Sequence, residues 1–558
     1  MTPLTEKICA TLQAIRDRSD DGIWISTFPE DALLARAAEI DADSRDLPLR
    51  GLTFAVKDNI DVLGLPTTVG CPEFSYNPTG NAFVVQTLLD AGAIAIGKTN
   101  LDQFATGLNG TRTPHPIPRN SINPAYVSGG SSSGSAIAVA HNIVDFSLGT
   151  DTAGSGRVPA AFNNLIGLKP TRGRWSTSGL IPACRSLDCI TVFAQTLDLT
   201  VRVDQTLARF DPADPYSRSA PEPVRPITNR LAILPESQRE FFGDTESARL
   251  YTEALTRLAD QGHELVEFDY EPFLEAATLL YNGPWIAERL AAIAPFLADH
   301  ADAIHPVVRQ LVEGGTRFSA VDTFTAQYRL AELARQTESL WTDCDAMLLP
   351  TAGTIFTVDQ MLADPVRLNS QLGHYTNFVN LLDLSALAVP AGFRPDGLPF
   401  GVTFIAPAWT EPRLAELAAT FLKTETPPAP TRIPLAVVGA HLRGEPLNAQ
   451  LLALGARFIR ATRTTPDYQL HALPDTDPEK PGLIRRRPGT PIEVEIWDLA
   501  PAAFGTFVAN IPAPLGIGTI TLEDGTSVKG FLCEDAALDG ATNISHHGGW
   551  RAYRQTKS

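Results

Sequence analysis

A serine- and glycine-rich stretch and one lysine are the residues of this sequence whose types and spacing could support nucleophilic catalysis. The stretch "VSGGSSSGSAIAVAHNIVDFSLGTDTAGSGRVPAAF", residues 127–162, crowds hydroxyl side chains between glycines. His263, His300 and His305 lie in ordinary helical or loop contexts, which do not predict a general base. Lys57 is the alternative base, because it ends the apolar run "GLTFAVK" and burial lowers the pKa of a lysine.

Three other interpretations of the stretch fit less well. A flexible Gly/Ser linker is disfavoured because the run continues directly into "AIAVAHNIV", which predicts a buried helix. A phosphate-binding loop would need a Lys-Ser/Thr pair after Gly134, and the sequence has none there. Residues 130–134 formally match the G-x-S-x-G nucleophile elbow, but the turn-rich "NPAYVSG" replaces the buried strand that an elbow follows. A serine activated by a lysine remains.

Composition limits the classes of protein to consider. The chain has 558 residues, 44% of them hydrophobic and 19% charged, which predicts a folded protein with a large domain and a smaller one. A net charge of −18 disfavours nucleic acid and anionic membrane surfaces as partners. The six cysteines lack metal-ligand or disulfide-framework spacing. The N-terminus lacks the apolar run of a signal peptide, and no window resembles a membrane span, so we expect a cytoplasmic protein.

Short apolar runs alternate with helical patterns along most of the chain. This alternation predicts α/β layers, with strands at 52–57, 93–99, 231–236 and 346–353 and helices at 83–92 and 245–262. The Pro- and Thr-rich segment 423–434 predicts a linker between a first domain, residues 1–422, and a second, residues 435–558. The second domain is expected to be small and rich in β-strands, because "PIEVEIWDL" and "GIGTITLEDGTSVKGFLCE" have strand character and the latter contains a DG turn.

Three pieces of sequence together resemble the amidase signature family. They are "FAVKDNIDV", "GGSSSGSA" and "LGTDTAGSGRVPAAFNNLIGLKPT", within residues 51–171. The resemblance implies an α/β/α sandwich around a mixed sheet and a Ser-Ser-Lys triad. Ser155 would be the nucleophile, Ser131 the bridging serine on a cis peptide and Lys57 the base.

The same resemblance implies an oxyanion hole. It would be formed by the backbone N–H groups of Thr152, Ala153 and Gly154, aimed at the charge that develops on the substrate carbonyl. Many members of the family carry glycine at the position of Ala153, so the loop packing differs here while the backbone donor is kept. No metal and no organic cofactor is implied.

Substrate choice is expected to depend on other residues. In "LLYNGPWIAERLAA", Tyr281 precedes a helix that starts at a proline, and Arg289 lies in its second turn, so both could face one pocket. An arginine presents a planar fork that matches a carboxylate. With "NFVNLLDLSALAVPAGF", "VTFIAPAW", "AVVGAHLRGEPLN" and "GGWRAY", this segment resembles the allophanate hydrolases, a narrower group of the same family. That resemblance implies that Tyr281 and Arg289 hold the carboxylate of allophanate, whose terminal amide is hydrolysed.

The second domain resembles a small fold of the gamma-glutamyl cyclotransferase type, in which the loop around His441 shapes a cavity. The resemblance implies that this domain promotes decarboxylation of the first product, with His441 as the candidate residue. The acidic residue of the cyclotransferases has no clear counterpart near "FGTFVANIP", so cyclotransferase activity itself is not expected.

The partners implied are a small-molecule substrate, a second copy in a homodimer and functional coupling with a biotin-dependent urea carboxylase. The upstream source of allophanate, from urea or from triazine breakdown by way of cyanuric acid, stays open. Two alternatives also stay open. One is another amidase or the glutaminase subunit of an amidotransferase, and the other is a non-catalytic scaffold, which an intact set of Lys57, Ser131 and Ser155 disfavours.

Overall fold

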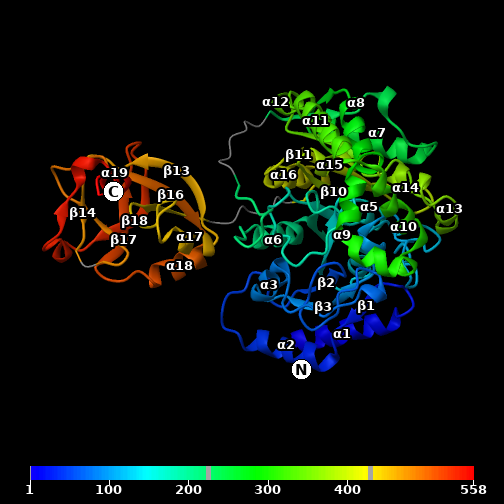
Figure 1. Cartoon of the computed structure of the whole chain (residues 1–558), viewed down its shortest axis with the longest axis horizontal. Coiled ribbons are helices and arrows are strands. Elements are labelled where there is room, and N and C mark those ends of the chain that lie inside the picture. The colour runs from blue at the N-terminus through cyan, green and yellow to red at the C-terminus, as the bar shows by residue number, and fades with distance from the viewer. Residues whose placement is uncertain (1, 221–227, 425–431, 475, 558) are drawn as a thin grey trace. The chain divides into compact units, whose positions relative to one another are not determined.

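The computed structural model describes residues 2–220, 228–424, 432–474 and 476–557, which form two compact units (Figure 1). Helix α16 (Glu411–Leu422) closes the first unit and is capped by Lys423 in a left-handed conformation with φ 56°. Strand β12 (Ile433–Val437) opens the second unit. Residues 425–431, the middle of the expected linker, lie outside the described residues.

A mixed sheet runs through the first unit, and within the described residues it contains eleven strands. Its spatial order is β1 (Trp24–Thr27), β3 (Ile94–Thr99), β2 (Thr53–Lys57), β4 (Phe146–Asp151), β6 (Cys189–Ala194), β5 (Ile166–Lys169), β10 (Leu384–Phe393), β11 (Pro399–Pro407), β9 (Ala346–Pro350), β7 (Arg230–Ile233) and β8 (Glu264–Glu267). β2 pairs in parallel with both β3 and β4, so the carboxyl ends of these three strands meet at one edge of the sheet.

Helices cover both faces of this sheet. The face built by Phe54, Val56 and Leu148 packs against α3 (Phe83–Asp90), α6 (Leu197–Leu207), α7 (Thr245–Asp260) and α16. The opposite face includes Ala55 and Met347 and packs against α1 (Pro3–Asp17), α2 (Glu30–Ala42), α4 (Ser133–Ala140), α8 (Glu271–Asn282) and α15 (Phe378–Leu381). Successive strand residues thus point to opposite apolar layers, as the period of two requires. The expected α/β/α sandwich around a mixed sheet is confirmed.

The first unit has further helices among its described residues. They are α5 (Val158–Phe162), α9 (Trp285–His300), α10 (Pro306–Glu313), α11 (Ala320–Thr337), α12 (Leu340–Asp343), α13 (Val358–Ala363) and α14 (Arg367–Leu372). The helix predicted from "AIAVAHNIV" is α4, which begins earlier, at Ser133, and ends at Ala140. It ends there because Asn142 adopts a left-handed conformation with φ 56°, which an α-helix cannot include.

The second unit is rich in β-strands, as expected. Its larger sheet has the order β13 (Arg457–Arg463), β16 (Glu493–Leu499), β12, β18 (Ser527–Cys533) and β17 (Leu515–Thr521), and its smaller sheet has β15 (Pro481–Arg485), β14 (Tyr468–Ala472) and β19 (Thr542–Asn543). Helices α17 (Asn448–Ala453), α18 (Pro501–Ala509) and α19 (Trp550–Gln555) accompany them. A separate apolar core that includes Leu435, Ile496 and Trp550 holds this unit together.

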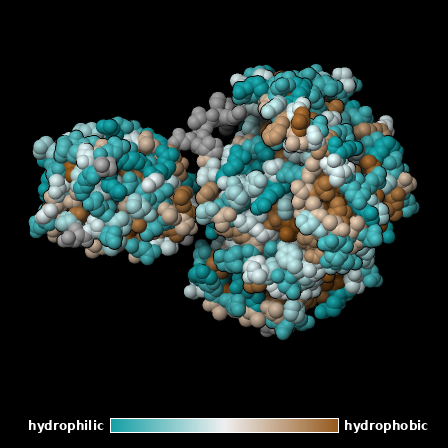
Figure 2. Space-filling view, viewed as in Figure 1, coloured by the Kyte–Doolittle hydropathy of each residue, from teal (hydrophilic) through white to brown (hydrophobic). Residues whose placement is uncertain are grey.

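Hydrophilic residues cover most of the face shown in Figure 2, in keeping with the burial of the large apolar side chains in the cores of the two units. None of the helices among the described residues combines the length and the apolar character needed to span a bilayer.

Candidate active site

Lys57 lies at the carboxyl end of β2 with its side chain fully buried. Its Nζ atom lies 2.7 Å from the Ser131 hydroxyl oxygen and 2.7 Å from the Thr150 hydroxyl oxygen. Burial lowers the pKa of Lys57 to about 7, although the carboxylates of Asp102 and Asp188 act in the opposite direction. The amine can therefore be neutral near neutral pH, which a general base requires.

Ser131 lies just before α4, and the peptide bond between Gly130 and Ser131 is cis. The backbone around it is tightly packed. Gly129 has φ 77°, and a Cβ atom added there would lie 2.8 Å from the Cα of Pro159. The carbonyl of Ser131 accepts a hydrogen bond from the N–H of Asp102 at 3.1 Å. These contacts fix the Ser131 hydroxyl in front of Lys57.

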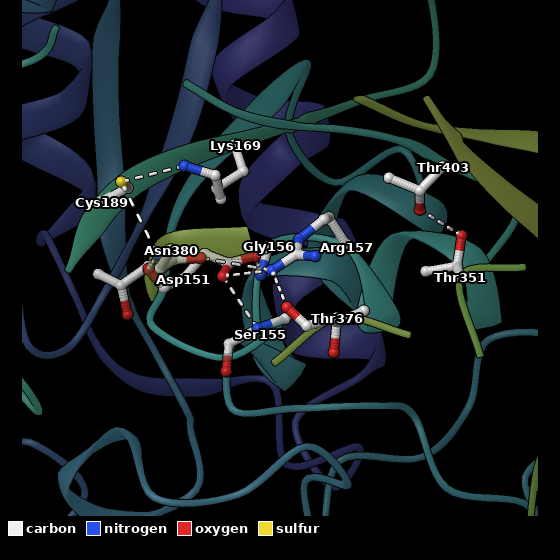
Figure 3. A network of polar contacts seen from close by, with 12 residues as sticks. Asp151, Ser155, Gly156, Arg157, Lys169, Cys189, Thr351, Thr376, Asn380 and Thr403 are labelled. Carbon is white, nitrogen blue, oxygen red and sulfur yellow. Dashed lines mark hydrogen bonds and ion pairs between the residues drawn. The ribbon is translucent and has the colours of Figure 1, made fainter. Parts of the chain in front are cut away.

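Ser155 follows β4 on a loop that a buried ion pair holds in place (Figure 3). The Asp151 carboxylate accepts two hydrogen bonds of 2.9 Å from the Arg157 guanidinium, and both side chains are fully buried. The same carboxylate accepts hydrogen bonds from the N–H groups of Gly154 and Gly156. Figure 3 shows the Ser155 side chain projecting away from this pair, so the clamp positions the hydroxyl without engaging it.

The Ser155 hydroxyl donates to the Gly107 carbonyl at 3.4 Å in this structure. Among the described residues no hydrogen bond joins it to Ser131. The structure therefore brings Lys57 and Ser131 into contact and leaves Ser155 in a resting position. Catalytic hydrogen bonds often form only when substrate is bound, and rotation about the Cα–Cβ bond of Ser155 redirects its hydroxyl.

The loop between β4 and Ser155 carries the candidate oxyanion donors. The N–H groups of Thr152 and Ala153 have no acceptor among the described residues, whereas that of Gly154 already donates to Asp151 at 2.9 Å. The Thr152 hydroxyl donates to Asp188, a buried carboxyl whose pKa burial raises to about 6. Two of the three expected N–H donors thus have no hydrogen-bond acceptor among the described residues.

Arg289 and Tyr281 meet at the junction of α8 and α9. Arg289 is only 3% exposed, and its Nη2 donates to the Tyr281 hydroxyl at 3.3 Å while the guanidinium lies 5.1 Å from the Tyr281 ring centre. Its Nη1 donates to the Thr106 hydroxyl at 3.2 Å, and its buried Nε has no partner among the described residues. Although burial opposes its charge, Tyr281, Cys184 and Asp188 hold the pKa of Arg289 above its usual value.

The segment Thr106–Gly107 lies between the Arg289 guanidinium and Ser155, the candidate nucleophile. Thr106 contacts Arg289, and the next residue, Gly107, accepts the hydrogen bond from Ser155. Arg289 is also close enough to Lys57 to lower its pKa. A substrate attacked at Ser155 would therefore meet a buried guanidinium a short distance beyond the reacting carbon.

His441 belongs to the second unit, where it lines a cavity of about 640 Å³. Its ring stacks on Phe531 and meets Phe507 edge-on, with ring centres 5.2 and 5.1 Å apart. Its Nε2 lies 3.1 Å from the Gln450 side-chain oxygen. Burial lowers the pKa of His441, Gln450 opposes this effect, and Lys480 adds to it. The cavity thus has in its wall an imidazole held between two aromatic rings, and burial disfavours the protonated form of this imidazole.

Sequence reasoning missed Thr150, Thr106 and the Asp151–Arg157 clamp. Thr150 lies near the carboxyl end of β4, which pairs in parallel with β2. A predicted strand at 146–151 would have been the signal for it, but this strand was not among those predicted from the sequence. Thr106 carries no such signal, because its position depends on an irregular loop. Within the part of the chain that the structure describes, no group of three or more His, Cys, Asp or Glu side chains is arranged to hold a metal ion.

Comparison with protein families assigns both units. Residues 4–415 match the family model described as Amidase, and residues 433–555 match the model described as Allophanate hydrolase C-terminal domain.

Individual relatives agree with the family models. A urea amidolyase of Saccharomyces cerevisiae is 43% identical over 570 residues, which cover 96% of this chain and 31% of that protein. The chain spans about a third of the length of this relative and of a second urea amidolyase, from Lachancea kluyveri. One subunit of the glutamyl-tRNA(Gln) amidotransferase of Streptococcus thermophilus is 32% identical over 75% of this chain and 92% of that protein. A solved structure of Kluyveromyces lactis allophanate hydrolase is 40% identical, with a TM-score of 0.73, over 100% of this chain and 97% of that one.

Proposed function

This chain belongs to the amidase family and is an amidohydrolase, and we propose that its substrate is allophanate, urea-1-carboxylate. It hydrolyses the terminal amide and releases ammonia and N-carboxycarbamate. Support comes from the similarity to the Kluyveromyces lactis allophanate hydrolase over both units and from the second family match at residues 433–555.

The observation that carries the choice of substrate is the buried Arg289, whose Nε has no partner among the described residues. Leaving a buried guanidinium donor without an acceptor costs free energy, so its retention favours a ligand that supplies one. The carboxylate of allophanate would accept from Arg289 and from the Tyr281 hydroxyl. This pairing would place the terminal amide over Ser155, on the other side of Thr106–Gly107.

In the proposed reaction, neutral Lys57 takes a proton from Ser131, which takes one from Ser155, while the Ser155 oxygen bonds to the terminal amide carbon. The N–H groups of Thr152 and Ala153 receive the oxyanion, and Gly154 can share its hydrogen bond with it. The C–N bond then breaks, and the proton held by Lys57 returns through Ser131 to the leaving ammonia. Water then attacks the acyl-enzyme. Its proton passes through Ser131 to Lys57 and returns by the same path to the Ser155 oxygen as N-carboxycarbamate leaves.

The Gly107 carbonyl has a part in this scheme. It accepts a hydrogen bond from the Ser155 hydroxyl at 3.4 Å. When Ser155 turns toward Ser131, the carbonyl is free to accept an N–H of the substrate's terminal amide. The same atom would thus hold the resting nucleophile and orient the leaving group.

We assign residues 1–422 to the amidase domain and 435–558 to a domain that assists the second step, loss of carbon dioxide from N-carboxycarbamate. The cavity around His441 supports this assignment, with His441 as the proton donor to nitrogen. We further propose that the enzyme works as a homodimer and that it is functionally coupled with a biotin-dependent urea carboxylase. The second proposal draws on the similarity to proteins named urea amidolyase.

The alternative, a glutaminase subunit of an amidotransferase, has support from the 32% identity to such a protein. It leaves the second unit and the Arg289 site without a role. Steady-state ammonia release from allophanate, biuret, malonamide and glutamine separates the two. The proposed function predicts that kcat/KM for allophanate exceeds the others by about a hundredfold or more, on the scale of one desolvated charge pair. A preference for glutamine would establish the alternative.

A further inference from the structure

The cavity of the second unit contains one cation among its described lining residues, Lys480, which precedes β15. The backbone of Lys480 is held at both ends: its N–H donates to the Thr476 hydroxyl at 2.9 Å, and its carbonyl accepts from the N–H of Leu473 at 3.1 Å. The next residue, Pro481, packs against Gly439 so closely that a Cβ on Gly439 would lie 2.2 Å from Pro481 Cδ. Lys480 is therefore fixed beside the loop that carries His441.

The charge of Lys480 is not neutralised by an ion pair with any of the described residues. Its neighbour Glu479 is occupied by Lys557, whose Nζ lies 2.8 Å away. Asp477 is the carboxylate among the described lining residues, yet no ion pair joins it to Lys480. Lys480 also acts electrostatically on His441, since it lowers the pKa of that imidazole. Lys480, which has no ion pair with any described residue, and His441 thus line the same cavity, whose other lining residues are largely apolar.

We propose that Lys480 is the carboxylate-binding residue of this cavity and that the cavity takes a small dicarboxylate. The inference rests on the proposed function of the second unit, and it deepens that function by naming the group that recognises the substrate. N-carboxycarbamate is such a dianion, with two carboxylates on one nitrogen.

The chemistry decides which carboxylate Lys480 holds. Decarboxylation breaks one C–N bond: the departing carboxylate leaves as neutral carbon dioxide, the bonding electrons go to nitrogen, and nitrogen takes a proton to give carbamate. A cation on the departing carboxylate would stabilise the ground state more than the transition state, in which that charge is moving to nitrogen. Lys480 therefore holds the carboxylate that stays, and the nitrogen between the two carboxylates faces His441, the proton donor. The negative charge of the bound dianion favours the protonated imidazole, so substrate binding itself prepares the acid.

The test uses the full-length chain and malonate, which has the same two carboxylates joined through carbon and cannot react. Calorimetric titrations are made in an Arg289→Ala background, so that binding in the first unit does not mask the cavity. Lys480→Met is expected to weaken malonate binding by about tenfold or more, since a hydrogen bond to a charged group contributes on that scale. Asp477→Asn is expected to tighten it, because a nearby carboxylate repels the ligand. Lys529→Met, the same change at an exposed lysine of β18, is the matched control.

Equal malonate affinities for Lys480→Met and Lys529→Met would overturn the proposal, and so would weaker binding by Asp477→Asn. A kinetic arm separates this inference from the proposed function. In chains that keep Arg289, Lys480→Met should release the first ammonia from allophanate at the rate of the unchanged chain while carbon dioxide lags, and Lys480→Arg should restore part of the loss. If allophanate gives no ammonia, the proposed function fails, and the malonate titrations still decide the role of Lys480. If ammonia is normal and carbon dioxide does not lag in Lys480→Met, the inference alone is wrong.

Discussion

The Nζ atom of Lys57 lies 2.7 Å from the hydroxyl oxygen of Ser131, and both side chains are fully buried. A charged ammonium in such a place is costly, and burial lowers the pKa of Lys57 to about 7. The same desolvation that disfavours the charge produces a neutral amine that can accept a proton from a hydroxyl. In the proposed mechanism, catalysis as well as stability depends on the protonation of Lys57, so both should follow pH.

Activity should rise with pH as Lys57 loses its proton. We predict that kcat/KM for the amide increases about tenfold per pH unit below about pH 7 and levels off above it, because only the neutral amine is a base. Between about pH 7 and the usual 10.5, the unfolded chain holds a proton that the native state lacks, so this group's contribution to the unfolding free energy rises with pH. Urea unfolding at both ends of this window should show the effect in the parent chain and less of it in Lys57→Met. A pH-independent kcat/KM between about pH 5 and 8 would contradict a neutral Lys57.

Thr150 should orient the base. A neutral amine has two N–H groups and one lone pair, and an N–H directed at the Thr150 hydroxyl oxygen turns the lone pair toward Ser131. We predict that Thr150→Val lowers kcat by about 10- to 100-fold with little change in KM, a part of what general-base catalysis contributes. Thr191→Val is the matched control, because the Thr191 hydroxyl lies buried on the neighbouring strand without a partner among the described residues. Equal kcat values for the two variants would remove Thr150 from the relay.

Arg289 should select substrates that carry a carboxylate. Arg289→Ala is expected to lower kcat/KM for allophanate by an amount that corresponds to roughly 2–5 kcal/mol of lost transition-state stabilisation. The kcat/KM for the neutral amide biuret should fall much less. Arg289→Lys should not restore the activity, because an ammonium cannot reproduce the guanidinium's simultaneous contacts with Thr106 and Tyr281. Equal losses on allophanate and biuret would show that Arg289 supports the fold of the site and does not read the carboxylate.

The first unit should act without the second. All the residues assigned to amide hydrolysis, from Lys57 to Arg289, belong to the first unit. A chain ending at residue 424 is expected to release the first ammonia at nearly the normal rate, while carbon dioxide lags behind because N-carboxycarbamate then decays unassisted. His441→Ala in the full chain should give the same lag. Paired time courses of both products provide the measurement. Coincident curves in both variants would rule out a decarboxylating second unit, and loss of the first ammonia would show that this unit supports the amidase fold.

The sequence predicted more of the fold than of the site. The strands at 53–57, 94–99, 230–233 and 346–350 were predictable because both faces of the sheet are covered, so that they appear as continuous apolar runs. The same pattern predicted the burial of Lys57. The order of the strands was not predictable, because it depends on pairings such as β5 with β10 between segments far apart in the chain.

Within the site, residue types were easier to identify than contacts. Tyr281 and Arg289 are eight positions apart across a helix junction, and their meeting depends on the turn at Gly283–Pro284. The hydrogen bond from Ser155 to Gly107 depends on a loop whose path no periodic pattern records. The role of Gly154 as a donor to Asp151 likewise follows from the folded loop alone.

Active-site labelling tests the central claim, that Ser155 attacks the terminal amide of allophanate, most directly. The full-length chain is treated with a fluorophosphonate, the labelled residue is located by peptide mass spectrometry, and ammonia release from allophanate is measured on the same samples. The proposed mechanism predicts one label per chain, on Ser155, with activity lost in proportion to labelling and neither label nor activity in Ser155→Ala. Labelling at another serine, or full ammonia release from a chain blocked at Ser155, would contradict it.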